Sequence, residues 1–251
     1  MELISPAEVA QFRDMGFFLT DVVFTPDELT AMAVEMDRMY EEDLRQAEAS
    51  GDGEAIEKAR SRRSFGQFHT LSPIAAEFVK KPIYLEACRR LIGADADLYY
   101  NQATTKMPEG YGKVFDWHQD SGYTTTEPLE YITCWTAISA SDLENGCIWV
   151  IPESHKRGVL EHLQEPEDPE RYGGKNAQLE NDQGAVPVEM RAGQVAIFSS
   201  LLLHRSGPNT SKDRPRRGYV PQYHVPDPIL VNTGQPWGDR IPVLRNGEAV
   251  D

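Results

Sequence analysis

The pair His118 and Asp120, together with the distant His204, constrains the fold more than any other feature of the sequence. His118 and Asp120 stand two residues apart, and on an extended strand the side chains of residues i and i+2 leave the same face. His204 comes much later, after a stretch typical of a buried strand and before a turn signal. A fold that aims all three side chains at one point must bring these distant segments together.

Two imidazoles and one carboxylate form the ligand set of non-haem Fe(II) oxygenases, in which one side of the metal stays open. Neutral His118 and His204 with ionised Asp120 would occupy one face of an octahedral ion and leave the other face for a co-substrate and dioxygen. An H-x-D match alone is a weak signal, and most single histidines are ordinary surface or core residues. Because each half of this set stands beside an expected strand, the three together predict an oxidising metal enzyme.

The first part of the chain carries helix signals. Ser5-Pro6 has the pattern of an N-cap followed by proline at the first helical position, and Thr25 and Glu28 have capping-box spacing. After Thr25, apolar residues recur at three- and four-residue steps, which indicates a helix face packed into the core rather than a binding surface. That stripe is Leu29, Met32, Met36 and Met39, and further helices are expected from Ser72-Pro73 and over Pro82–Ile92.

A basic cluster, Lys58-Ala59-Arg60-Ser61-Arg62-Arg63, stands out in an acidic protein. One interpretation is a cationic helix C-terminus, which the helix dipole favours. The other is a clamp for an anionic substrate. We favour the first, because an isolated basic run is poor support for a function.

From Leu98 the hydrophobic period changes to two. Tyr100, Gln102, Thr104 and Lys106 share one face of an expected strand. Further strands are expected over 131–138, 147–151, 194–198 and 216–224, with Asn145-Gly146 as a turn and Pro221 marking an edge position or a bulge. Residues 164–185 are polar and predict a mobile surface loop, and the prolines after 225 predict an irregular tail.

Helices followed by hairpin-linked strands indicate one α+β, mainly β domain over residues 1–251. It would have a helical part at about 1–95, an antiparallel barrel at about 96–225 and an irregular C-terminal tail. No apolar run reaches the roughly eighteen residues that span a bilayer, and the N-terminus lacks a secretory pattern, so we expect a cytoplasmic protein with no membrane partner. A net charge of −15 argues against nucleic acid, and the three cysteines predict buried, reduced thiols.

Several stretches carry a family resemblance over roughly residues 10–225. They are Trp117-His118-Gln119-Asp120, Asn145-Gly146-Cys147 through Pro152-Glu153-Ser154-His155-Lys156, and His204-Arg205-Ser206-Gly207-Pro208-Asn209 with Arg216. In these the chain resembles the phytanoyl-CoA dioxygenase family of Fe(II)/2-oxoglutarate-dependent oxygenases. The resemblance implies a double-stranded β-helix (jelly-roll, cupin-like) barrel with flanking N-terminal helices. It also implies Fe(II), the co-substrate 2-oxoglutarate and O2, with His118, Asp120 and His204 as metal ligands and catalytic residues.

In that family an arginine shortly after the second histidine pairs with the far carboxylate of 2-oxoglutarate, a task suited to a planar guanidinium. Arg214, Arg216 and Arg217 are all near the matching place, and strand alternation favours Arg216, although its spacing from His204 is one residue longer than the family pattern. The resemblance also places Gln102, Trp135 and Ser206 at co-substrate contacts, with Arg62 and Arg63 near the place of a further basic contact. The competing interpretations are a strand amide for Gln102, a core indole for Trp135 and a turn hydroxyl for Ser206.

The implied reaction decarboxylates 2-oxoglutarate to succinate and CO2 while oxidising an unactivated C–H bond of a small-molecule metabolite. Hydroxylation is the default outcome, and desaturation, cyclisation or rearrangement use the same centre. The alternatives are a β-barrel metal enzyme that does not use 2-oxoglutarate and a non-catalytic ligand-binding barrel. The acidic composition favours a free metabolite over a coenzyme A thioester, and Tyr123 and His69 are candidates for the substrate pocket.

Overall fold

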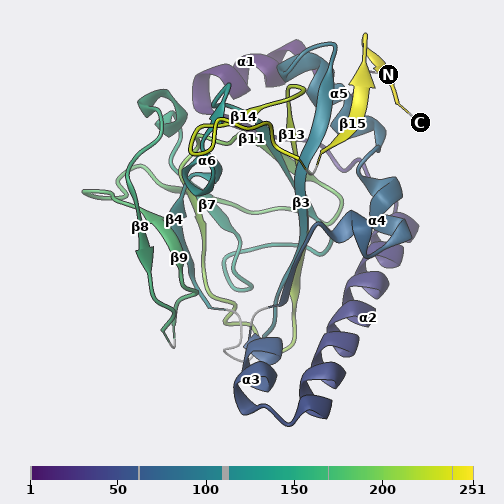
Figure 1. Cartoon of the computed structure of the whole chain (residues 1–251), viewed down its shortest axis with the longest axis vertical. Helices are drawn as coiled ribbons and strands as arrows, with labels where there is room; N and C mark the ends of the chain where they lie inside the picture. The colour runs from purple at the N-terminus through teal and green to yellow at the C-terminus, as the bar shows by residue number, and fades with distance from the viewer. Residues whose placement is uncertain (1, 62, 109–112, 169, 239, 251) are drawn as a thin grey trace.

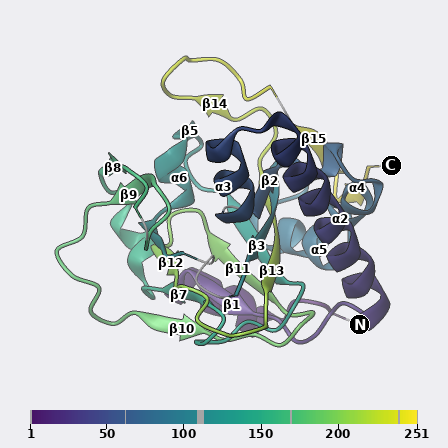
Figure 2. The same cartoon turned by 90° about the horizontal axis from the view of Figure 1, so that it is seen from below.

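The structure is a computed structural model that describes residues 2–61, 63–108, 113–168, 170–238 and 240–250. Two antiparallel sheets face each other, and helices cover the outer side of the larger one (Figures 1 and 2). The helices are α1 (Pro6–Met15), α2 (Pro26–Ser50), α3 (Gly53–Ser61), α4 (Pro73–Phe78), α5 (Pro82–Leu91) and α6 (Asp120–Tyr123), with short 3-10 turns at Phe68–Thr70 and Ser154–Arg157.

The starts of the first two long helices follow the sequence signals. Ser5 caps α1 and Thr25 caps α2, and in each case a glutamate three residues later completes a capping box. Gly16 ends α1 in the left-handed conformation, with φ of 86°. The basic cluster begins in the last turn of α3, in agreement with the helix C-terminus interpretation, while its residue Arg62 lies outside the described residues.

The large sheet has the strand order β1-β11-β6-β13-β3-β15-β16, and β2 also pairs with β3. Its two central strands, β13 and β3, are antiparallel and in register over most of their length. The strands are β1 (Phe17–Leu19), β2 (Arg63–Gly66), β3 (Ala96–Lys106), β6 (Ile132–Ala137), β11 (Val195–Ser199), β13 (Arg216–His224), β15 (Ile241–Arg245) and β16 (Glu248–Ala249).

The small sheet has the order β10-β7-β12-β4 and packs against the inner face of the large sheet. Its strands are β4 (Phe115–His118), β7 (Ile148–Val150), β10 (Val186–Val188) and β12 (His204–Ser206). Two further strand pairs stand apart, one of β5 (Thr126–Glu127) with β14 (Ile229–Leu230) and one of β8 (His162–Glu165) with β9 (Gly174–Ala177). This architecture is the double-stranded β-helix with flanking helices that the family resemblance implied, and it agrees with the α+β, mainly β class expected from the sequence pattern.

Alternation along β13 divides the core into two layers. Tyr219 and Tyr223 face the helices and join the larger apolar cluster, whereas Val220 faces the small sheet and packs with Trp135 and Phe198. Arg216 therefore shares the inner face with Val220, as strand periodicity requires. In the part of the chain that the structure describes, no helix is long and apolar enough to cross a membrane.

Two expectations about local structure need correction. Residues 164–185, predicted as a mobile loop, include the end of β8 and all of β9, which form a paired hairpin. The tail, predicted to be irregular, contains β15, which extends the large sheet, with Val243 and Leu244 fully buried. The apolar residues directly after Pro242 supply this packing, which the number of prolines in the tail does not reveal.

Pro221 does not mark an edge strand, because β13 pairs with β3 on one side and β6 on the other. The register against β3 shifts between Gln222 and Tyr223, directly after the proline, so the alternative expectation of a bulge fits better. Proline has no backbone N–H to donate, and an irregular pairing accommodates this loss. The three cysteines are buried and free, as predicted.

Candidate active site

His118, Asp120 and His204 converge where β4 and β12 lie side by side. His118 is the last residue of β4, Gln119 stays extended with φ of −118° and ψ of 138°, and Asp120 opens α6. The extended Gln119 thus keeps His118 and Asp120 on one side even though Asp120 is outside the strand. His204 opens β12 directly opposite His118 in the antiparallel register.

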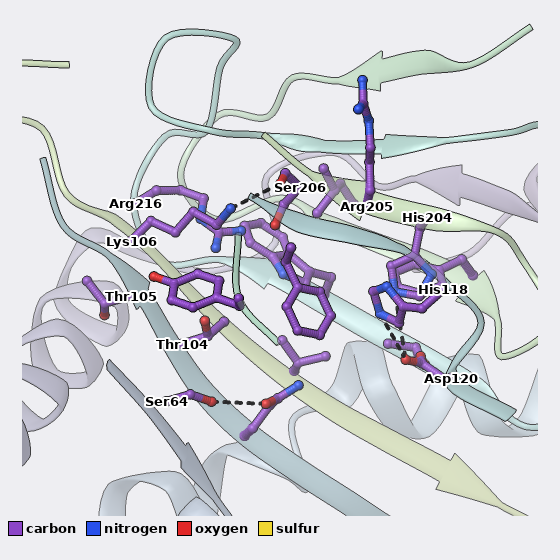
Figure 3. Close-up of a pocket in the computed structure, with 18 residues that line it drawn as sticks. Ser64, Thr104, Thr105, Lys106, His118, Asp120, His204, Arg205, Ser206 and Arg216 are labelled. Atoms are coloured by element: carbon purple, nitrogen blue, oxygen red, sulfur yellow. Dashed lines mark hydrogen bonds and ion pairs between the residues drawn. The ribbon is translucent and has the colours of Figure 1, made fainter. Parts of the chain in front are cut away.

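The geometry of these three side chains suits one metal ion. The Nε2 atoms of His118 and His204 lie 3.9 Å and 3.7 Å from Oδ1 of Asp120, and one ligand atom from each residue lies within 4.8 Å of the others. Figure 3 shows the two imidazoles and the carboxylate pointing toward one another at one end of a cavity.

Backbone and side-chain partners fix the orientation of each candidate ligand. Nδ1 of His118 lies 2.8 Å from the Asp116 carbonyl and Nδ1 of His204 lies 2.9 Å from the Leu202 carbonyl, so each Nδ1–H donates and each Nε2 presents its lone pair to the centre. Thr133 donates to Oδ2 of Asp120 over 2.5 Å. Burial, with His204 nearby, holds the pKa of His118 well below its usual value, which favours the neutral form that binds metal.

Gln119, the residue between the two candidate ligands, is fully buried and ties their surroundings together. Its Nε2 donates to the carbonyls of Gly158 and Leu201, each over 2.7 Å, and its Oε1 accepts from the Leu160 N–H. Its own N–H donates to His162. The H-x-D segment is thereby fastened to the chain that leads into His204.

The opposite end of the cavity, whose volume is about 120 Å³, carries Arg216 and Lys106 (Figure 3). The Arg216 guanidinium is 2% exposed and lies over the Trp135 ring, 5.1 Å from its centroid. Its Nε has no hydrogen-bond partner, and no ion pair joins Arg216 to a carboxylate among the described residues. Burial lowers its pKa to about 10.

Lys106 is also buried beside Arg216. Its Nζ donates to the carbonyls of Lys113, Ser206 and Gly207 rather than to any described carboxylate. Burial, and then the charge of Arg216, hold the pKa of Lys106 well below its usual value. Two buried basic side chains with no carboxylate partner in the described part of the chain make this end of the cavity suited to an anion.

The structure distinguishes the three candidate arginines by their partners. Arg214 pairs with Asp142 and Glu144, and Arg217 pairs with Asp37 of α2. Both therefore connect structural elements outside the cavity. Of the three, Arg216 alone lines the cavity.

Gln102, Trp135 and Ser206, the other residues that the resemblance singled out, all line the same cavity. Oε1 of Gln102 accepts from Ser64 over 3.1 Å, and the Ser206 carbonyl accepts from Lys106. Trp135 lies close to Gly218 on the neighbouring strand, where a Cβ atom would come within 2.5 Å of the indole. Of the two arginines expected near a further basic contact, Arg62 lies outside the described residues and Arg63 begins β2, which pairs with β3.

Several lining residues were not singled out from the sequence. Lys106 and Thr104 alternate with Gln102 on β3, so the same face could have indicated them. Tyr172 lies in the region mistaken for a loop. A second cavity adjoins the first at His118 and Asp120, and both Tyr123, a sequence candidate, and Trp237, from the tail, line it. His69 lines neither cavity and contacts Asn101 instead.

Comparisons with known proteins identify the family of this chain. The family model for phytanoyl-CoA dioxygenase (PhyH) matches residues 12–218. The ectoine dioxygenase of Bordetella parapertussis is 27% identical over 228 residues, which cover 84% of this chain and 72% of that protein. Phytanoyl-CoA dioxygenase domain-containing protein 1 of Mus musculus is 27% identical over 266 residues, covering 88% of this chain and 90% of the relative.

Among solved structures, EvdO2 from Micromonospora carbonacea var. aurantiaca complexed with 2-oxoglutarate has a TM-score of 0.68 at 20% identity, covering 95% of this chain and 100% of that one. At this identity the likeness shows a shared fold. The family match, by contrast, spans most of the sequence and includes every residue of the candidate centre. The chain therefore belongs to the phytanoyl-CoA dioxygenase family and is a dioxygenase-type oxidoreductase.

Proposed function

We propose that the protein is an Fe(II)/2-oxoglutarate-dependent dioxygenase that oxidises an unactivated C–H bond of a small-molecule metabolite. The reaction consumes 2-oxoglutarate and O2 and releases succinate and CO2, with one oxygen atom entering succinate and, in a hydroxylation, the other entering the product. One observation carries the proposal. A three-residue metal-ligand set lies at one end of a cavity whose other end holds a buried arginine without a carboxylate partner.

The residues present fit the cofactors. His118, Asp120 and His204 would hold Fe(II), because their free donor atoms face one another while hydrogen bonds occupy the others. Bound iron with 2-oxoglutarate supplies the activation of dioxygen. The chain's own contribution is to orient these ligands through their hydrogen bonds and to bury the two imidazoles.

Arg216 would receive the far carboxylate of 2-oxoglutarate, with Trp135 packed against the guanidinium and Lys106 adding positive charge. This assignment favours a 2-oxoglutarate enzyme over a metal enzyme that does not use it, because such an enzyme has no need of a buried, unpaired cation at this place. Gln102 and Ser206 line the same cavity and would contact the co-substrate there.

The test begins with anaerobic binding. Fe(II) and 2-oxoglutarate together should produce a weak visible metal-to-ligand absorption band in the wild-type protein. The band should be absent in His118→Ala at the same ligand concentrations. If the wild type is as featureless as His118→Ala under saturating ligands, the proposal is wrong.

The arginine is tested against a matched control. A charge-assisted hydrogen bond contributes about 1.5–3 kcal/mol, so Arg216→Ala should raise the 2-oxoglutarate concentration needed for half-maximal binding by about 10- to 100-fold. Arg217→Ala removes a neighbouring cation that pairs with Asp37 and should leave this concentration unchanged. Equal effects of the two substitutions would contradict the role of Arg216.

A further inference from the structure

The second cavity has a different character from the co-substrate cavity. It has a volume of about 290 Å³ and shares His118 and Asp120 with the first cavity, but neither Arg216 nor Lys106 lines it. It therefore extends from the candidate metal ligands away from the two buried cations. Its position suits the molecule whose C–H bond is oxidised.

Aromatic side chains make up much of its wall, and none of its described lining residues is Lys or Arg. The Tyr99 and Tyr131 rings lie 4.9 Å apart, and the Tyr99 and Trp237 rings lie 4.8 Å apart. Burial raises the pKa of Tyr99 to about 12 and holds the pKa of Tyr131 well above its usual value, with the charge of Asp120 adding to both. The hydroxyls thus remain neutral.

Trp237 comes from the C-terminal segment, beyond the residues 12–218 that the family model matches. Its indole N–H donates to the Tyr99 carbonyl over 3.1 Å, and its carbonyl accepts from Arg240 over 2.7 Å. Arg240 in turn pairs with Asp97, which is 1% exposed, and with Asp227. Trp237 is therefore a fixed part of the cavity wall.

These features restrict the charge of the occupant. An anionic group in this cavity would meet no described lysine or arginine side chain to offset its desolvation. A flat or apolar face would instead pack on the aromatic rings, and a cation would be attracted to the faces of those rings. The cavity also holds only a small molecule.

Resting on the proposed function, we infer that the substrate is a small uncharged or cationic molecule with a flat or apolar face, and that Trp237 is a specificity-determining residue. Substrates that carry a phosphate or carboxylate into this cavity, and coenzyme A thioesters that rely on basic side chains there, are disfavoured.

The test uses three para-substituted phenols with the same ring and a different charge on the side chain. They are 4-ethylphenol, which is neutral, tyramine, which is cationic, and 4-hydroxyphenylacetate, which is anionic. Each is titrated anaerobically into the Fe(II) protein saturated with 2-oxoglutarate, and binding is followed by perturbation of the visible band. Saturation with 2-oxoglutarate keeps the anion out of the Arg216 end.

The neutral and cationic phenols should bind at least tenfold more tightly than the anion. Trp237→Ala should weaken their binding by about three- to tenfold, and Trp237→Phe should retain most of it. Trp149→Ala is the matched control, since this tryptophan packs on Arg205 and lines neither cavity. The Trp149→Ala protein should bind the phenols as tightly as the wild type does.

Two results would overturn the inference while leaving the proposed function intact. In one, the visible band forms but the anion binds as tightly as the other phenols, or none of them binds. In the other, Trp237→Ala and Trp149→Ala bind the phenols alike. Failure of the band itself in the wild type would instead reject the proposed function.

Discussion

Gln119→Ala offers a sharp test of how the candidate metal centre is held. The substitution removes a buried amide that links Gly158, Leu160 and Leu201. It leaves His118 and Asp120 chemically unchanged. Any loss of metal affinity must therefore arise from the position of the ligands rather than from their identity.

The magnitude follows from the groups left behind. Two carbonyls and one N–H lose their partner, and each buried polar group left unpaired costs about 1–3 kcal/mol, less where water enters the new space. The free energy of unfolding of the metal-free protein should fall by about 2–4 kcal/mol. Loss of an outer partner typically weakens metal binding by about 10- to 100-fold, and we expect a loss in that range here.

Two measurements separate these effects. Urea denaturation of the metal-free protein gives the stability, and calorimetric titration with Co(II) as a stand-in for Fe(II) gives the affinity. Gln194→Ala is the control, because Gln194 is another buried amide, bonded to Thr20 and Arg191 away from the candidate centre. It should lower stability without changing Co(II) affinity. Equal Co(II) affinity in the two variants would refute the positioning role of Gln119.

Three other predictions concern the cavity wall, pH and ligand removal. Gly218→Ala should displace Trp135 and raise severalfold the 2-oxoglutarate concentration needed for half-maximal binding, measured by titration of the visible band. Gly53→Ala is the control and should leave this concentration unchanged, because a Cβ atom there meets nothing within 4 Å. Burial lowers the pKa of His224 to about 4, so the unfolded chain binds more protons between about pH 6.5 and 4, and stability from neutral His224 is lost as pH falls through this window. The stability advantage of the wild type over His224→Gln should therefore shrink on acidification by up to about 3 kcal/mol in urea denaturation, and a constant difference would contradict this reasoning. Removing the metal with a chelator should leave far-ultraviolet circular dichroism unchanged, because the main core lies between the helices and the large sheet. In the metal-loaded protein, 2-oxoglutarate at a hundred times its Kd should raise the free energy of unfolding by about 2.7 kcal/mol. Removing the metal should abolish this stabilisation. If the stabilisation persists without metal, the co-substrate does not bind through the metal.

The parts of the fold that local chemistry controls were predictable from the sequence. Capping boxes at Ser5 and Thr25 set the helix starts, and alternation through β3 and β13 put Gln102 and Arg216 on inward faces. The convergence of His118, Asp120 and His204 was predictable because each stands at the end of a strand or next to one. The family match and the fold confirm the resemblance that these segments carry.

The remainder depends on contacts that no local pattern encodes. Lys106 is a site candidate only because β13 brings Arg216 beside it. Its position in the alternating pattern of β3 could not reveal this, because a lysine exposed to solvent would show the same alternation. Trp237 lies in a proline-rich tail and reaches the cavity through the pairing of Arg240 with Asp97, more than a hundred residues away in the sequence. The β8–β9 hairpin is polar, with β8 mostly exposed and β9 largely half-buried, so its strands lack the apolar alternation that reveals a strand.

The pairing of β12 has a consequence for how this centre can change. His204 stands between His118 of β4 and Val150 of β7, and its neighbour Arg205 lies on the outer side between two indoles. A slip of one residue would exchange the two side chains, turning the imidazole outward and a guanidinium inward. We therefore expect altered length in the connection after β12 to be tolerated far better than a single insertion before it, which would remove His204 from the candidate metal site while preserving all three candidate ligands in the sequence.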